Sequence, residues 1–166
     1  MSLFTPLAVP LAVVGITFVV VLLARQLARP APLRYKPRLL MTSNELEFFH
    51  RIRRAALDGF VFPQVAMAGL IEPDGLSGKA YQTAFRRISQ KRVDFVVYDS
   101  SMRLIAVIEL DDRTHNSAQD AERDAKLLTA GVRTLRYQSK SKPNETKIQT
   151  DLVSIFHEQR LARSMC

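Results

Sequence analysis

The chain has 166 residues, of which 47% are hydrophobic, 8% aromatic and 24% charged, and these proportions exclude a chain that is disordered throughout. Its single cysteine, Cys166, excludes an intrachain disulfide and a zinc site built from cysteines. The net charge of +8 at pH 7 favours an anionic partner, either nucleic acid or anionic lipid.

The first predicted element is an apolar helix. Residues 7–24 carry no charge and are long enough to cross a hydrocarbon layer about 30 Å thick. Basic residues follow this segment and none precedes it, so the positive-inside rule predicts a single-pass protein of the inner membrane with its C-terminal domain in the cytoplasm. A cleaved signal peptide is the alternative, although its charges would run in the opposite order. The predicted organisation is a transmembrane anchor at 1–24, a basic proline-containing linker at 25–41 and one α/β domain at 42–166.

The domain begins with a predicted helix. Thr42 and Glu45 have the spacing of a capping box, and apolar residues then recur at helical intervals. The positions expected to face the core are Leu46, Phe49, Ile52 and Ala56. Residues 60–67 follow as a predicted strand, and the proline within them indicates an edge strand or a bulge. A short helix is predicted at 79–90.

Two strong strands come next, VDFVVYD at 93–99 and RLIAVIELD at 103–111, and the turn residues between them predict an antiparallel hairpin. A helix is predicted from Ser117 to the stop at Gly131, and a strand follows at once. An amphipathic helix after Pro143 ends the domain. The order α, β, α, β, β, α, β, α predicts an α/β fold with a mixed central sheet flanked by helices.

Charge is unevenly distributed over this domain. Residues 109–126 include six acidic residues against three basic ones, in a protein that is basic as a whole. A protein that holds a metal ion inside a phosphate-binding surface needs such a distribution. A solvated helix of mixed charge is the alternative.

Three carboxylates of the hairpin are the candidate metal ligands. They are Asp94, Glu109 and Asp111. If the turn between the strands spans four residues, Asp94 faces Val107, Glu109 is diagonal to Asp94, and all three acids project from one face. Oxygen ligands at this spacing favour Mg²⁺ or Mn²⁺, which activates water and stabilises charge on a phosphoryl oxygen. The alternative is that Arg113 and Arg123 pair with these acids.

The segments DFVVYD, VIELDDRTH and ERDAKLLTAGVRTLRY together resemble the PD-(D/E)XK, or restriction-endonuclease-like, superfamily. Within it, the chain is most similar to very-short-patch-repair-type endonucleases and related bacterial domains of unknown function. The resemblance extends from Thr42 to Tyr137, and IELDDRTH is its most specific part. It implies a restriction-endonuclease-like sheet and a Mg²⁺-dependent endonuclease that hydrolyses phosphodiester bonds in DNA.

The resemblance also implies roles for single residues. Asp94 and Glu109 would bind the metal, and Glu45 would complete its shell unless it only caps its helix. The superfamily usually has a lysine two residues after the motif glutamate, where this chain has Asp111. Asp111 and His115 are the predicted catalytic substitutes, with His115 as general base or phosphate contact.

Basic residues near this segment are the predicted phosphate contacts. Arg123 and Lys126 would touch phosphate or replace the missing lysine, or else form salt bridges along their helix. A second basic group would bind nucleic acid or form a solvated face. This group consists of Arg86, Arg87, Lys91 and Arg92.

Two functions other than DNA hydrolysis stay open. The absent lysine favours a catalytically inactive, nuclease-like module that binds nucleic acid or a protein partner at the membrane. A membrane-associated adaptor whose acidic segment is purely structural is the third possibility, and it would fold normally without binding metal.

Overall fold

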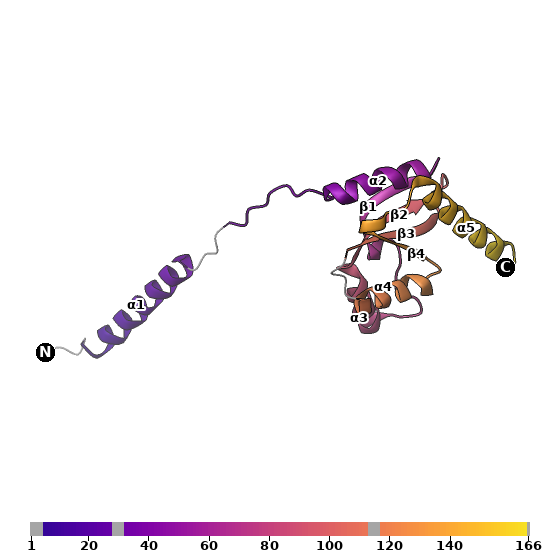
Figure 1. Ribbon diagram of the computed structural model, residues 1–166. Coiled ribbons are helices and arrows are strands. Elements are labelled where there is room, and N and C mark those ends of the chain that lie inside the picture. Colours follow the sequence, from indigo (N-terminus) through magenta and orange to yellow (C-terminus); the bar gives the residue numbers. More distant parts are fainter. Residues whose placement is uncertain (1–4, 28–31, 113–116, 166) are drawn as a thin grey trace. The chain divides into compact units, whose positions relative to one another are not determined.

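The computed structural model describes residues 5–27, 32–112 and 117–165 (Figure 1). The chain divides into two units, Met1–Arg38 and Leu39–Cys166. Residues 32–39, which belong to the predicted linker, form neither helix nor strand.

The first unit contains one helix, α1 (Thr5–Leu27), which covers the apolar segment predicted at 7–24. Its described side chains, residues 12–25, are exposed. Among the helices of the described residues, none has the length and apolar character that crossing a membrane requires. The location at the inner membrane stays a prediction.

The second unit is built on a four-stranded sheet in its described part. The strands are β1 (Phe60–Ala66), β2 (Arg92–Tyr98), β3 (Leu104–Asp111) and β4 (Arg133–Gln138), in the spatial order β1-β2-β3-β4. Antiparallel pairing joins β1 to β2 and β2 to β3, whereas β4 is parallel to β3. The predicted mixed sheet and its hairpin are therefore confirmed. β1 lies at an edge, where the proline that it contains is tolerated.

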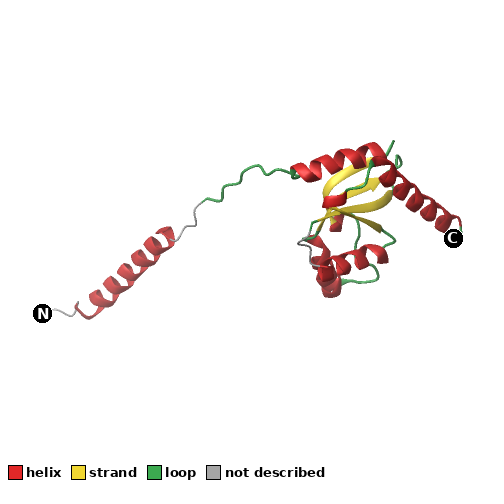
Figure 2. Ribbon diagram, viewed as in Figure 1, coloured by secondary structure: helices red, strands yellow, loops and turns green. Residues whose placement is uncertain are grey.

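Helices cover both faces of this sheet (Figures 1 and 2). The helices of one face are α2 (Ser43–Ala55) and α5 (Glu145–Ser164), and those of the other are α3 (Gly78–Ser89) and α4 (Ser117–Thr129). Phe48 of α2 and Ile148 of α5 share one apolar core with Phe95. Ile88 of α3 and Leu127 of α4 share a second core with Val96 and Val107, on the opposite side of the sheet. Two short 3-10 helices, Met67–Gly69 and Ser139–Ser141, follow β1 and β4.

The face of α2 that enters the core differs in part from the prediction. Ile52 is buried as expected, but Leu46 is 44% exposed and Phe48 is fully buried. Phe48 packs edge-on against Phe95, with ring centroids 6.0 Å apart, and against Tyr137. Because these aromatic contacts bury more apolar surface than Leu46 would, they set the rotation of the helix.

The hairpin of β2 and β3 pairs two residues away from the predicted register. Val107 lies opposite Val96, whereas the prediction placed it opposite Asp94. The register shifts between Val97 and Tyr98, next to the turn. Continued toward the start of β2, the pairing places Asp94 opposite Glu109 instead of diagonal to it. A shift of two residues keeps each side chain on its face of the sheet, so the predicted common face is preserved.

Candidate carboxylate and arginine site

Asp94 and Glu109 are the centre of the candidate site. Adjacent strands carry them, and their carboxyl groups are close enough to interact through a hydrogen bond. Asp94 Oδ2 also accepts a hydrogen bond of 3.0 Å from the backbone N–H of Leu110. Glu109 is only 1% exposed, in a place where an apolar side chain would be expected. Two acidic groups therefore share one partly dehydrated space.

Burial determines the ionisation of this pair. It raises the pKa of Glu109 to about 8, and the neighbouring carboxylate of Asp94 adds to the rise. Burial also raises the pKa of Asp94, and the negative charge of Glu45 contributes in the same direction. The positive charge of Arg123 opposes both shifts without cancelling them. The pair therefore retains a proton at neutral pH.

Arg123 of α4 is a cation that lies beside Glu109. Its Nη2 atom lies 3.2 Å from Glu109 Oε1 and 3.3 Å from Asp120 Oδ1. Among the described residues, however, neither Glu109 Oε1 nor Arg123 Nη2 has a hydrogen-bond partner. Arg123 thus lies close to an acid, as the predicted alternative requires, but forms no hydrogen bond with it. It leaves the buried oxygen of Glu109 without a directed donor, which is a costly state in a protein interior.

Arg136 of β4 binds Asp111 through two parallel hydrogen bonds. Its Nε donates to Asp111 Oδ2 over 2.9 Å, and its Nη2 donates to Oδ1 over 2.8 Å. Such bidentate pairs are among the strongest ionic contacts in proteins. That Asp111 joins Asp94 and Glu109 as a third metal ligand stays a prediction, and in this structure an arginine holds its carboxylate.

Two acids of α4 complete the charged network. Arg136 Nη1 donates to Asp124 Oδ2 over 2.7 Å, and Arg136 Nη2 lies 3.2 Å from Asp120 Oδ2. We call the whole set the carboxylate–arginine cluster: Asp94, Glu109, Asp111, Asp120, Arg123, Asp124 and Arg136. Acids outnumber arginines in it even after the proton on the central pair is counted, so the cluster keeps a negative charge.

No set of three or more histidine, cysteine, aspartate or glutamate side chains within the described residues is arranged to hold a metal ion. In the same region Arg136 binds Asp111 and Arg123 lies beside Glu109. His115, the predicted general base, and Arg113 lie outside the described residues.

Glu45 links helix α2 to the site. Its Oε2 accepts hydrogen bonds from the backbone N–H and the hydroxyl of Thr42, at 2.6 and 2.7 Å, so the predicted capping box is formed. Its Oε1 accepts a hydrogen bond of 3.4 Å from Gln64 Nε2. Glu45 therefore caps its helix with one oxygen and turns the other toward strand β1.

Gln64 is a residue that the sequence did not single out. Its φ of 55° is left-handed, which is uncommon for a residue other than glycine. Its neighbours in β1, Pro63 and Val65, pair with residues on either side of Asp94, so Gln64 lies opposite Asp94. Strained backbone of this kind gathers at functional sites. The only sequence signal was Pro63, which indicated a bulge without identifying the residue that adopts it.

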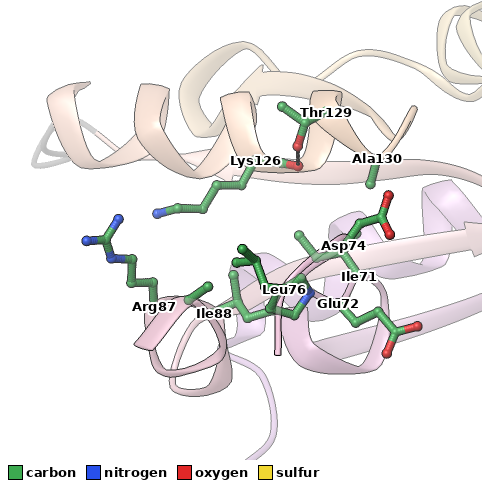
Figure 3. A pocket seen from close by; sticks show the side chains of 11 residues that line it. Ile71, Glu72, Asp74, Leu76, Arg87, Ile88, Lys126, Thr129 and Ala130 are labelled. Carbon is green, nitrogen blue, oxygen red and sulfur yellow. Dashed lines mark hydrogen bonds between the residues drawn. The ribbon is translucent and has the colours of Figure 1, made fainter. Parts of the chain in front are cut away.

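The predicted phosphate contacts lie on and near α3. Arg86, Arg87 and Arg92 are exposed, and Lys91 is half-buried. Lys126 of α4 pairs with Glu122 at 2.5 Å and lines a pocket together with Arg87 (Figure 3). Lys126 therefore lies on the α3 side of the domain, whereas Arg123 and Arg136 are the cations that the described part of the chain places at the carboxylates.

The cluster contains a protonated acid pair, further carboxylates that give it a net negative charge, and two arginines. Asp94 and Glu109 are able to exchange their proton for a cation, and Arg123 is suited to an anion.

A protein-family model described as "Protein of unknown function (DUF2726)" matches residues 37–155. The chain belongs to this family.

The chain is also similar to a bacterial protein. A protein of Haemophilus influenzae, which bears the description "Uncharacterized protein", is 30% identical over 128 residues. The alignment covers 72% of this chain and 62% of that protein, so less than two thirds of the relative is represented. No solved structure matches the chain.

The DUF2726 match contains the whole carboxylate–arginine cluster, together with Glu45 and Gln64. It begins in the linker, so α1 lies outside it, and it ends within α5. The family therefore corresponds to the α/β domain that carries the site.

Proposed function

We propose that the α/β domain is a nuclease that hydrolyses phosphodiester bonds in DNA with the help of Mg²⁺ or Mn²⁺. The observation that carries the proposal is the pair formed by the half-buried Asp94 and the buried Glu109, whose charges repel unless a proton or a cation lies between them. The resemblance of the IELDDRTH region to PD-(D/E)XK endonucleases gives the same assignment to this pair.

The donor set fits a hard divalent cation. Glu109 Oε1 is buried and has no hydrogen-bond partner among the described residues, so it is a carboxylate oxygen available to a metal. Asp94 Oδ2 is held by the N–H of Leu110, which fixes the orientation of that carboxylate. Carboxylate oxygens are the ligands that Mg²⁺ and Mn²⁺ prefer. When bound, such an ion would lower the pKa of a coordinated water and offset charge on a phosphoryl oxygen.

The arginines have a part in this proposal. Arg123 lies beside Glu109 and lowers the cost of a negative charge there. It would be left to contact a phosphate oxygen if a cation neutralised that carboxylate. Arg136 holds Asp111 by two hydrogen bonds, so Asp111 is poorly placed to accept a proton from water. His115 stays the proposed general base for that step.

A second candidate function is a nuclease-like module that binds nucleic acid, or a protein partner, without cutting. The bidentate pair of Arg136 and Asp111 favours this second function. Asp111 stands where the superfamily usually carries its lysine, and its carboxylate is held by Arg136. The basic residues of α3 would serve such a module equally well.

A cleavage assay with the full-length protein separates the two functions. Plasmid, single-stranded DNA and RNA are incubated with Mg²⁺, with Mn²⁺ or with EDTA, and Asp94→Asn is compared with the wild type. A nuclease gives products that depend on metal and that the variant fails to make. DNA binding without any metal-dependent product supports the non-catalytic module, and product formation in EDTA or by Asp94→Asn contradicts the proposed mechanism.

The location at the inner membrane is a further part of the proposal. It rests on the apolar residues of α1 and on the basic residues that follow them. Fractionation of cells that express the full-length protein, with a reporter at its C-terminus, tests it. Recovery in the soluble fraction, or a reporter outside the cytoplasm, would reject it.

A further inference from the structure

A pocket of about 460 Å³ lies between α3 and α4, apart from the carboxylate–arginine cluster. Its apolar surface comes from the loop that precedes α3, through Ile71 and Leu76, and from α3 itself, through Ala84 and Ile88. Thr129 lies on the α4 side (Figure 3). The pocket thus offers an apolar floor between two helical walls, of a size that suits a small planar group.

The two ends of the pocket carry opposite charges. Arg87 of α3 and Lys126 of α4 extend toward one another at one end, and Glu72 and Asp74 lie at the other (Figure 3). A ligand with an anionic group and an apolar body is therefore accepted in only one orientation, with the anion at Arg87 and Lys126.

The cationic end has a surplus of positive charge. Glu122 is the carboxylate paired with Lys126, and its pKa is lowered by Lys126 and also by the charges of Lys91 and Arg87. Three cations thus act on one carboxylate. This end continues into the basic group of α3 and β2, along which the backbone of a nucleic acid would run.

We propose that the pocket between α3 and α4 receives an unpaired nucleobase, and that the phosphate of the same strand lies between Arg87 and Lys126. This inference rests on the proposed function in that it takes nucleic acid as the partner, but it requires no catalysis. A nucleobase supplies a flat apolar face for Ile71, Leu76 and Ile88. Glu72 and Asp74, at the other end, repel phosphate and are able to accept hydrogen bonds from amino groups of bases.

Filling the pocket tests the inference most simply. Binding of a short labelled single strand and of a duplex with the same sequence is measured by fluorescence anisotropy, with full-length protein in EDTA so that no DNA is cut. Ala84→Phe places a ring in the pocket, and Gln82→Phe adds the same ring at an exposed position of the same helix that does not line the pocket. We expect Ala84→Phe to weaken single-strand binding about tenfold and to leave duplex binding nearly unchanged. Gln82→Phe should affect neither.

A charge test accompanies it. Arg87→Ala with Lys126→Ala should weaken single-strand binding more than Arg53→Ala with Lys147→Ala, which removes equal charge from the helices on the other face of the sheet. Lys147 is a suitable match, because it also pairs with an acid one turn away along its helix. Equal losses in the two double variants would show that the cations act only through overall charge, and this would overturn the placement of the phosphate.

The outcomes distinguish this inference from the proposed function. Single-strand binding that Ala84→Phe leaves intact overturns the pocket alone. Absence of binding to any DNA removes both the inference and the nucleic-acid partner of the proposed function. If Ala84→Phe lowers the melting temperature, Thr129→Phe, at an exposed position of the other wall, replaces it with the same expected result.

Discussion

Glu109 makes the stability of this protein depend on pH. Its pKa is raised by burial from 4.5 to about 8, so between these values the folded protein holds a proton that the unfolded chain releases. The free energy of unfolding therefore falls as pH rises through this range. Glu109→Gln keeps a neutral group of the same shape and removes this dependence. Measured by urea unfolding, the variant should gain at least about 1 kcal/mol over the wild type between about pH 5 and about pH 8.

A matched control for this pH effect is Glu158→Gln, which removes an exposed glutamate. Its stability should follow that of the wild type at every pH. If the stability of the wild type and of Glu109→Gln changed with pH in the same way, Arg123 would keep Glu109 ionised. That result would contradict the protonated pair.

Gln64 offers a test of whether backbone strain is maintained for function. Its left-handed φ of 55° suits glycine, so Gln64→Gly should leave the protein as stable or raise its free energy of unfolding by up to about 1 kcal/mol. The same variant loses the hydrogen bond to Glu45 and should bind Mn²⁺ more weakly. Thermal melts with and without Mn²⁺ check both effects. A large loss of stability would show instead that the side chain is structural.

At the level of elements, the hairpin of β2 and β3 shows which features could be predicted from the sequence. Alternation and turn residues predicted both strands and the common face of Asp94 and Glu109, because these depend on local pattern. The turn moved the pairing by one residue, because Tyr98 lies opposite Leu104 and not Arg103, and the irregularity between Val97 and Tyr98 moved it by one more. No local signal in the sequence predicts either change. A shift of one residue would have separated the two acids, so the prediction survived because the shift was even.

The place of Arg136 in the site could not be predicted from the sequence. Arg136 lies in β4, which is parallel to β3 and is connected to it in the chain by α4. Which residue of β4 stands opposite Glu109 depends on how that connection packs, and no spacing in the sequence fixes it. The predicted site therefore included the acids that the structure places on one face but lacked the arginine that holds Asp111. Gln64 was missed for a related reason, because its conformation follows from packing at the sheet edge.

Helix α3 and the start of β2 carry the predicted nucleic-acid surface. If this surface binds phosphates, affinity falls steeply with salt. Replacing Arg86, Arg87, Lys91 and Arg92 by alanine should then lower the slope of log K against log salt by about 0.9 for each phosphate that the protein ceases to neutralise. Base preference along a duplex should stay weak. Titrations at several salt concentrations measure the slope. An unchanged slope would contradict a role for these residues.

At the level of the whole molecule, the chain combines an apolar N-terminal helix with one domain of the DUF2726 family. The charge of that domain is organised: acids gather between the sheet and α4, and basic residues gather on α3. This separation is what a phosphate-binding enzyme with a metal centre requires, since the cation must lie among acids and the nucleic acid among basic residues.

The measurement that tests the metal centre most directly is the melting temperature of full-length wild type and Glu109→Ala, each with Mn²⁺, with Mg²⁺ and with EDTA. A ligand that binds only the folded state raises the melting temperature. We predict that metal stabilises the wild type and not the variant. In EDTA the variant should melt at the same temperature as the wild type or slightly higher, because it removes a carboxyl group whose burial beside a second acid is costly. A wild type that gains nothing from metal, together with a variant that melts far lower in EDTA, would show that Glu109 is a structural partner of Arg123 and would contradict the nuclease proposal.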